Sequence, residues 1–307
     1  MKLSVISPVY KAADCVDELI SRTVIGSEEI TSDYEIILVD DGCPEGSWEK
    51  IKENCLKNSK IRGIKLSRNF GQHYALNAGL ESASGDLIII LDCDLQDDPK
   101  YFKKFFNHYK KGYDIVFSKI DRKNHTFFKN ITASIYTSIF NYLLKDKSLN
   151  SDTSTNGFTM FSSKVKKAYL DVNDYHRHYL YIMRWIGFKH GFITIKHNPR
   201  YAGQSSYTFK KLLSHALNGI TSQSNKLLKL TIYLGFFLSF LSLLASFYIF
   251  IKAFYVPFKP GWASTSILIL LMGGLIIFSV GIAGIYIGKT FEQSKQRPLY
   301  IIDETLN

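Results

Sequence analysis

Four short apolar runs near the start of the chain each end in polar side chains, and this repetition limits the folds open to it. The runs cover Leu3–Ser7, Tyr34–Val39, Ile61–Leu66 and Leu87–Ile90. Helical stretches are expected at Ser47–Asn58, Gln72–Ala83 and Pro99–Lys111. Strands that alternate with helices form parallel βαβ units, and ligands of such sheets bind beyond the carboxyl ends of the strands. We therefore predict an α/β domain with a binding site at that edge.

The most informative strand end carries two carboxylates. Asp92 and Asp94 follow the run Leu87–Ile90, and Gln96 comes two residues later. Alternate residues of an extended chain project to the same side, so these three side chains can face one divalent cation together with phosphate oxygens. An acidic turn after a strand is often only a solvated cap. The polar residues at the other strand ends favour a metal-nucleotide site instead.

Several motifs occur together along the chain. They are Ser7-Pro8-Val9-Tyr10, Val39-Asp40-Asp41-Gly42, Arg68-Asn69-Phe70-Gly71, Asp92-x-Asp94-x-Gln96-Asp97 and Arg200-x-x-Gly203-x-Ser205-x-Tyr207. In this order they resemble family 2 glycosyltransferases. Within that family the chain is similar to the polyprenyl-phosphate branch, which includes dolichol-phosphate mannose synthases and bacterial undecaprenyl-phosphate glucosyltransferases. The resemblance implies a GT-A (Rossmann-like) nucleotide-sugar-binding domain.

The resemblance also implies a donor site. Asp92, Asp94 and Gln96 would form the catalytic and metal-binding set, with Mg²⁺ or Mn²⁺ stabilising the charge that develops on the leaving nucleoside diphosphate. The donor nucleotide, with a UDP-hexose favoured, would contact Pro8, Tyr10, Asp40, Asp41 and Arg68. The two aspartates would accept hydrogen bonds from base or ribose, while Pro8 and Tyr10 would shape the base pocket. For Arg68 two interpretations remain, a contact with a site carboxylate or donor phosphate and a surface ion pair.

The acceptor site is implied in the same way. Contacts to the acceptor phosphate would come from Arg122, Lys123, Lys129, Arg200 and Ser205. A polyprenyl monophosphate is largely dianionic above its second pKa of about 6, so it needs positioning rather than a protein base. Arg200 and Ser205 belong to a segment expected to close over both substrates. The basic cluster at Arg122 is alternatively only a solvated face.

One segment departs from the branch. Many members carry Gly-Asp-Phe-Arg where this chain has Asn156-Gly157-Phe158-Thr159, so an acidic residue and an arginine are absent. Three interpretations stay open: the acceptor phosphate reacts without that carboxylate, Asp152 replaces it, or the acceptor is a different molecule.

The last third of the chain contains two long runs without charge. Residues 230–251 and 263–288 comprise 22 and 26 residues, each long enough for a helix to cross a bilayer. A buried core hairpin is the alternative. Seven lysines and arginines flank the pair on the outside and two lie in the connecting loop, which predicts a cytoplasmic catalytic domain and cytoplasmic termini. We expect a glycosyltransferase domain over 1–206, an interfacial helix over 207–229, two membrane helices over 230–288 and a tail over 289–307.

The overall charge and the cysteines narrow the class of protein further. The net charge is +11, but the sequence contains no basic stripe with interleaved aromatic residues, so we expect no nucleic-acid partner. We expect the excess of basic residues to contact the lipid bilayer and a lipid phosphate instead. The four cysteines show no Cys-x-x-Cys spacing and are expected to be reduced. The first residues show no apolar signal-peptide run, and assembly into a homo-oligomer stays open.

The sequence thus predicts a multi-pass protein of the bacterial inner membrane that inverts configuration while moving a hexose from a nucleotide sugar to polyprenyl (undecaprenyl) phosphate. Two alternatives stay open. One is transfer to a hydroxyl of a lipid-linked saccharide, which requires a general base. The other is a catalytically silent membrane scaffold.

Overall fold

The computed structural model describes residues 1–121, 155–175, 177–199, 226–253, 255 and 261–307. Arg122, Lys123, Lys129, Asp152, Arg200 and Ser205 therefore lie outside the described residues, as does most of the expected interfacial helix. The chain forms two compact units. Of the described residues, those up to 199 and those from 297 onwards form the first unit, and residues 226–296 form the second.

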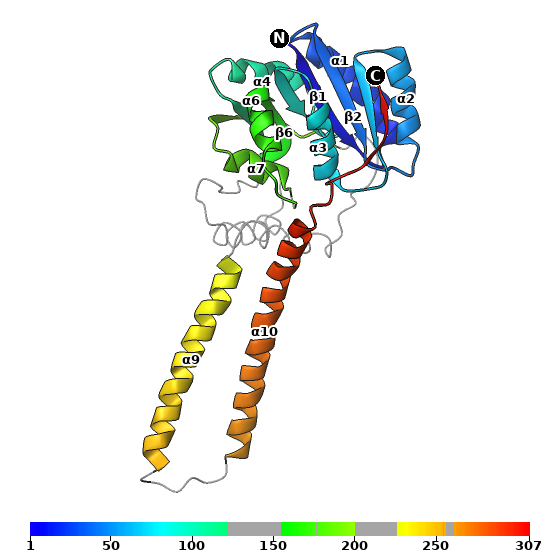
Figure 1. The fold of residues 1–307 in the computed structure, drawn as a ribbon. Coiled ribbons are helices and arrows are strands. Elements are labelled where there is room, and N and C mark those ends of the chain that lie inside the picture. The colour runs from blue at the N-terminus through cyan, green and yellow to red at the C-terminus, as the bar shows by residue number, and fades with distance from the viewer. Residues whose placement is uncertain (122–154, 176, 200–225, 254, 256–260) are drawn as a thin grey trace. The chain divides into compact units, whose positions relative to one another are not determined.

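The first unit is built on one mixed sheet of eight strands in the order β7-β5-β6-β4-β1-β2-β3-β8 (Figure 1). The strands are β1 (Leu3–Val9), β2 (Tyr34–Asp40), β3 (Ile61–Leu66), β4 (Leu87–Ile90), β5 (Ile115–Ile120), β6 (Thr155–Ser162), β7 (His190–Ile195) and β8 (Ile302–Leu306). The four apolar runs become β1 to β4, which pair in parallel as predicted.

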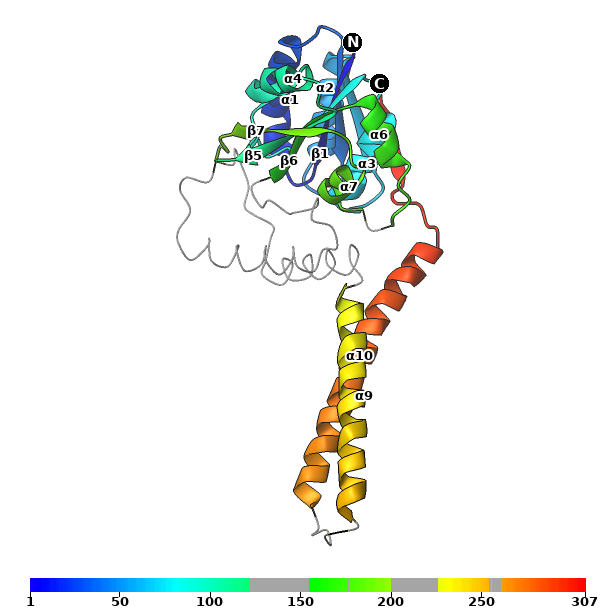
Figure 2. The same cartoon turned by 90° about the vertical axis from the view of Figure 1, so that its left-hand side faces the viewer.

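Helices cover both faces of this sheet, which explains why its central strands β1, β2 and β4 are buried along their whole length. Their bounds are α1 (Ala13–Glu28), α2 (Ser47–Lys57), α3 (Gln72–Ser82), η1 (Pro99–Tyr101), α4 (Phe102–Tyr109), α6 (Ser163–Leu170) and α7 (Tyr179–Trp185). One hydrophobic cluster joins α1, α2 and α4 to the sheet, and a second joins α3, α6 and α7 to it from the other side (Figure 2). The domain is therefore a three-layer α/β structure.

On the far side of β4 from β1, the sheet contains both parallel and antiparallel strand pairs. Strand β6 lies between β4 and β5 and runs antiparallel to both, whereas β5 and β7 pair in parallel. The expectation of parallel βαβ units over the first 118 residues therefore holds for β1 to β4, and β5 joins the sheet through a strand from later in the chain.

The C-terminal segment forms β8, a strand that the sequence analysis did not foresee. It runs antiparallel to β3, with Gly63 opposite Leu306 and Lys65 opposite Glu304. The side-chain nitrogen of Asn307 donates to the carbonyls of Cys55 and Ile61 at 2.9 and 2.7 Å. Strand β8 thereby covers the hydrogen-bonding edge that β3 would otherwise expose.

The second unit contains two long helices, α9 (Lys226–Ala253) and α10 (Trp262–Ser294). Among the described residues, one helical segment is long and apolar enough to cross a membrane, the 23 residues Met272–Ser294 of α10. The other predicted crossing, residues 230–251, lies within α9, which is helical over that whole range. Its crossing of a bilayer stays a prediction.

Candidate functional site

The carboxyl ends of β1, β2 and β4 meet at one edge of the sheet. Val9 lies opposite Asp40 and Ile6 lies opposite Ile90, so the residues that follow these strands emerge side by side. Strands β2 and β3 lie on one side of β1 in the sheet, and β4 lies on the other side. The strand order reverses between β1 and β4, which is the position where open α/β sheets bind their ligands.

Residues 91–98, which follow β4, form an acidic loop with a defined shape. Leu95 adopts a left-handed backbone conformation with φ of 57°, and its side chain is buried in the core. Asp94 Oδ1 accepts a hydrogen bond from the backbone nitrogen of Gln96 at 3.1 Å. Asp98 accepts a hydrogen bond from the backbone nitrogen of Lys100 at the start of η1. These contacts turn the extended chain into a compact loop beside the switch point.

Asp92 lies at the start of this loop in an unfavourable electrostatic setting. Its Oδ1 atom accepts a hydrogen bond from the side-chain nitrogen of Gln72, the first residue of α3, at 2.7 Å. Part of its surface is exposed, yet the surrounding protein removes hydration from the carboxylate. This desolvation, followed by the negative charges of Asp97 and Asp94, raises the pKa of Asp92 to about 7. A cation would relieve the repulsion among these carboxylates.

The acidic loop fits a hard divalent cation by its chemistry. Asp92, Asp94 and Gln96 carry oxygen atoms on one short loop, and Mg²⁺ usually takes one or two carboxylates together with substrate phosphates. Within the described ranges, no group of three or more His, Cys, Asp or Glu side chains is placed so that it could hold a metal ion by itself.

The paired aspartates after β2 have different surroundings, which the sequence motif did not distinguish. Asp41 accepts hydrogen bonds from the backbone nitrogens of Phe70 at 2.8 Å and Gly71 at 2.9 Å, which fixes the turn after β3. Asp40 Oδ1 accepts one from the backbone nitrogen of Cys43 at 2.9 Å. Its buried Oδ2 has no hydrogen-bond partner among the described residues. Burial raises the pKa of both carboxyls.

The other predicted donor contacts surround this edge. Pro8 is buried within β1, and Tyr10 follows β1 with its side chain partly exposed. The guanidinium of Arg68 lies 4.1 Å from the centre of the Phe70 ring and donates to the carbonyl of Asn69. Gly42 approaches the backbone of Arg68 so closely that a Cβ atom would lie 2.4 Å from its carbonyl carbon. Arg68 is thus held near Asp41 without an ion pair to it among the described contacts.

A polar network behind the acidic loop was not predicted from the sequence. Asp97 is buried, and both its oxygens accept hydrogen bonds from the side-chain nitrogen of Asn156, at 2.8 and 3.0 Å. His197 Nε2 lies 3.3 Å from Asp97 Oδ1. The hydrogen bond to Asp97, reinforced by the nearby carboxylates, raises the pKa of His197. No local motif points to this network, because its members are 59 and 100 residues apart along the chain.

The segment that departs from the family pattern lies at the start of β6. Thr159 is buried, and its hydroxyl hydrogen-bonds to the hydroxyl of Tyr179. Among the described residues, no atom lies within 4 Å of a Cβ atom added at Gly157.

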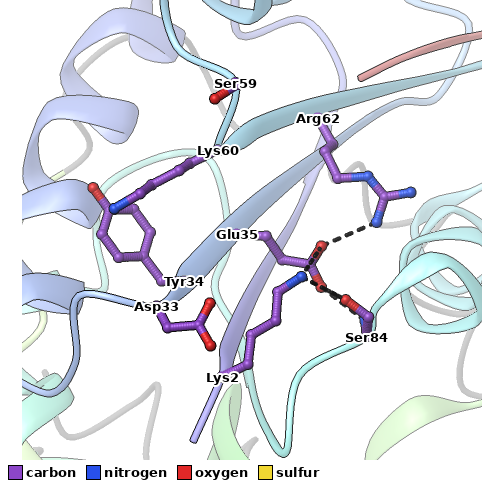
Figure 3. Close-up of a pocket in the computed structure, with 8 residues that line it drawn as sticks. All are labelled: Lys2, Asp33, Tyr34, Glu35, Ser59, Lys60, Arg62 and Ser84. Atoms are coloured by element: carbon purple, nitrogen blue, oxygen red, sulfur yellow. Dashed lines mark hydrogen bonds and ion pairs between the residues drawn. The ribbon is translucent and has the colours of Figure 1, made fainter.

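A pocket of about 380 Å³ lies at the opposite edge of the sheet from the acidic loop, near the starts of β1, β2 and β3 (Figure 3). It is lined by Lys2, Asp33, Tyr34, Glu35, Ser59, Lys60, Arg62 and Ser84. Glu35 is paired there with Arg62 at 3.0 Å and Lys2 at 3.3 Å. Burial favours the neutral acid, but hydrogen bonds from Ser4, Ser84 and Arg62 outweigh it and lower the pKa of Glu35 to about 2. This cluster is a structural one.

The four cysteines are all free, as the sequence predicted. Cys15 and Cys55 are buried, and Cys43 and Cys93 are partly exposed.

The chain is similar to known proteins over nearly its whole length. The chain is 31% identical over 99% of its length to an uncharacterized glycosyltransferase of Synechocystis, of which the match covers 95%. It is 29% identical to the bactoprenol glucosyl transferase of Shigella phage SfV, with 98% of each chain covered. Among solved structures, the glucosyl-3-phosphoglycerate synthase of Mycobacterium tuberculosis, in complex with Mn²⁺, uridine diphosphate and phosphoglyceric acid, matches with a TM-score of 0.51. That match has 13% identity and covers 72% of this chain and 76% of the other.

The structural match identifies the fold alone, whereas the sequence matches identify the family. Residues 4–170, more than half of the chain, match the sequence profile of Glycosyl transferase family 2. Strands β2 to β6, all but the first residue of β1, and the acidic loop between β4 and η1 lie within that range, whereas β7 and β8 lie beyond it. The chain therefore belongs to glycosyl transferase family 2.

Proposed function

We propose that this protein is a membrane-anchored, metal-dependent, inverting glycosyltransferase that moves a hexose from a nucleotide-diphosphate sugar to polyprenyl phosphate. The observation that carries the proposal is that the Asp92 and Asp94 carboxylates lie at the same edge of the sheet as the buried Oδ2 of Asp40, which has no hydrogen-bond partner among the described residues. The two carboxylates of Asp92 and Asp94 suit a cation and a diphosphate. The Asp40 oxygen suits an N–H or O–H donor on a nucleoside.

On this proposal the donor lies across the ends of β1, β2 and β4. A buried carboxylate oxygen without a partner costs free energy, and a hydrogen bond from the base or ribose would recover it. Asp40 is therefore the proposed nucleoside contact, whereas Asp41 supports the site by holding the turn at Phe70 and Gly71. Asp92, Asp94 and Gln96 would hold Mg²⁺ or Mn²⁺, which would stabilise the charge on the departing diphosphate. The solved structure of the same fold contains Mn²⁺ and uridine diphosphate, which supports this choice of metal and a uridine-diphosphate donor.

The acceptor is proposed from the relatives and from the chemistry of a phosphate nucleophile. Bactoprenol glucosyl transferases match this chain over nearly its whole length. A dianionic lipid phosphate needs no general base, and a cationic surface is sufficient to position it. Arg122, Lys123, Lys129, Arg200 and Ser205 remain the proposed contacts for that phosphate.

Strand pairing supports a membrane hairpin of two helices. Strand β8 follows α10 in the chain, yet it pairs with β3 of the N-terminal domain. Two strands of one sheet must lie on the same side of a membrane, so the chain between β7 and β8 must cross an even number of times. If Met272–Ser294 crosses, a second segment must cross as well, and α9 is the apolar helix available. We place the catalytic domain and both termini in the bacterial cytoplasm.

The direct test uses the purified full-length protein in detergent with Mn²⁺, a panel of nucleotide sugars and three acceptors. These are undecaprenyl phosphate, undecaprenol and a lipid-linked saccharide. We expect transfer to the phosphate alone, with a rate that falls as the pH drops through about 6, the second phosphate pKa. Transfer to a saccharide hydroxyl instead would establish the alternative enzyme. A protein that binds donor but transfers to none of these acceptors, with no donor hydrolysis, would favour the silent scaffold.

A further inference from the structure

The acidic loop is joined by several contacts to a second segment, residues 196–198, which follows β7. The backbone nitrogen of Asn198 donates to the carbonyl of Gln96 at 2.9 Å, and the side-chain nitrogen of Gln96 donates back to the carbonyl of Asn198 at 3.4 Å. Gln96 is thus held through its main chain and its side chain by one residue, 102 positions away.

Two more contacts extend this junction along the loop. The side-chain nitrogen of Asn198 donates to Asp98 Oδ2 at 3.2 Å, and His197 Nε2 lies 3.3 Å from Asp97 Oδ1. Three successive residues of the loop, Gln96, Asp97 and Asp98, are therefore each held from the same side. The backbone nitrogen of Lys196 donates to the hydroxyl of Tyr101, which continues the junction beyond the loop.

The orientation of Asp97 is fixed from the sheet as well. The side-chain oxygen of Asn156 accepts hydrogen bonds from the hydroxyl of Ser118 and from the backbone nitrogen of Phe158. Its side-chain nitrogen is consequently directed at both oxygens of Asp97. The buried Asp97 carboxylate is thus held between Asn156 on β6 and His197, the latter being the partner that carries a charge when protonated.

From these contacts we propose that His197 is a positioning residue, which holds the acidic loop through Asp97 in the shape required to bind a divalent cation. The proposal rests on the metal-dependent function proposed above. Outer groups that orient the ligands of a metal typically change its affinity by about 10- to 100-fold when they are removed. Asp97 immediately follows Gln96, so a shift of Asp97 moves a proposed ligand directly.

The experiment measures Mn²⁺ binding to the purified full-length protein in detergent, by electron paramagnetic resonance, without and with UDP. His197→Ala should weaken Mn²⁺ binding about 10- to 100-fold. His197→Gln keeps an N–H donor of similar reach toward Asp97, so it should bind Mn²⁺ within about threefold of the wild type if donation to Asp97 is what matters. His190→Ala is the matched control, because His190 is exposed on β7 and packs on Phe117 and Phe192.

The outcomes separate this inference from the proposed function. Wild-type protein that binds Mn²⁺ neither alone nor with UDP would overturn the metal dependence and the positioning role together. Wild-type protein that binds Mn²⁺, with His197→Ala equal to it, would overturn only the role of His197. Recovery of the melting temperature but not of Mn²⁺ affinity in His197→Gln would also overturn it, because the hydrogen bond to Asp97 would then serve the fold alone.

Discussion

The indole nitrogen of Trp48 donates a hydrogen bond to Glu304 at 3.0 Å, although 256 positions separate the two residues along the chain. Lys52 contacts the same carboxylate at 3.1 Å. Helix α2 and strand β8 therefore belong to one folded unit, although residues 226–296, which lie between them in the chain, belong to the other unit. This relationship makes the membrane topology testable with single substitutions.

The topology prediction concerns both ends of α10. With a cytoplasmic catalytic domain, a membrane-impermeant thiol reagent applied to intact cells should modify Thr265→Cys near the connecting loop. It should spare Ser294→Cys at the other end of the helix. After permeabilisation the second variant should react too, which controls for accessibility. Labelling of Ser294→Cys but not Thr265→Cys in intact cells would reverse the proposed orientation.

A second prediction concerns the metal. Asp94→Asn keeps Oδ1 as the acceptor for the backbone nitrogen of Gln96, so the loop should keep its shape while losing a negative charge. We expect kcat to fall about 100-fold or more, because a bound cation contributes several kcal/mol of transition-state stabilisation. Circular dichroism should show an unchanged fold. Asp171→Asn, at an exposed position after α6, serves as the control, and retention of full Mn²⁺-dependent turnover by Asp94→Asn would refute the metal assignment.

The substitutions Asp40→Asn and Asp41→Asn each keep the size of the side chain, and we expect them to change different properties of the protein. Asp40→Asn should weaken UDP binding, measured by titration calorimetry, with little change in melting temperature, because its Oδ2 has no protein partner among the described residues. Asp41→Asn places an amide nitrogen against the backbone N–H of Phe70 or Gly71. It should lower the free energy of unfolding by about 1 to 3 kcal/mol. The assignment of roles would be wrong if Asp40→Asn left the UDP affinity unchanged.

Glu35 predicts a dependence of stability on pH. Its pKa falls from 4.5 to about 2 in the folded state, so the native protein holds this carboxylate ionised where the unfolded chain would protonate it. The stabilisation is complete above about pH 4.5 and is lost as the pH falls toward 2; it amounts to roughly 3 kcal/mol.

The corresponding measurement is thermal unfolding of the wild type and Glu35→Gln between pH 7 and pH 3. Glu35→Gln should melt lower at pH 7, and the gap between the two proteins should narrow as the pH falls. Glu45→Gln, which removes an exposed ion pair with Lys11, should stay close to the wild type at every pH. A constant gap for Glu35→Gln across this range would contradict the depressed pKa.

The features that could be predicted from the sequence are those that depend on residues close together in the chain. The strands β1 to β4 and the acidic loop follow from apolar runs that end in polar residues, so Asp92 and Asp94 were placed at a sheet edge correctly. The difference between Asp40 and Asp41 could not be predicted, because it depends on backbone nitrogens about 30 residues away. The contact of His197 with Asp97 was not predicted for the same reason. A single histidine forms no sequence motif, and the two residues meet only because β7 lies beside the acidic loop in the folded domain. Strand β6 pairs with β4 and strand β8 pairs with β3 over long sequence separations. The periodicity of apolar residues along the chain cannot predict such pairing.

The position of β8 also constrains how the protein is made. Domains generally fold from the N-terminus while the ribosome is still adding residues. The partner of β3 is encoded in the last six residues, after both long helices. Throughout synthesis of those helices the nascent domain therefore carries an open strand edge, which is the kind of surface that pairs with other chains. The sheet can therefore close only after residues 302–306 have been synthesised, and a ribosome that stalls before residue 302 would leave the edge of β3 without its partner strand.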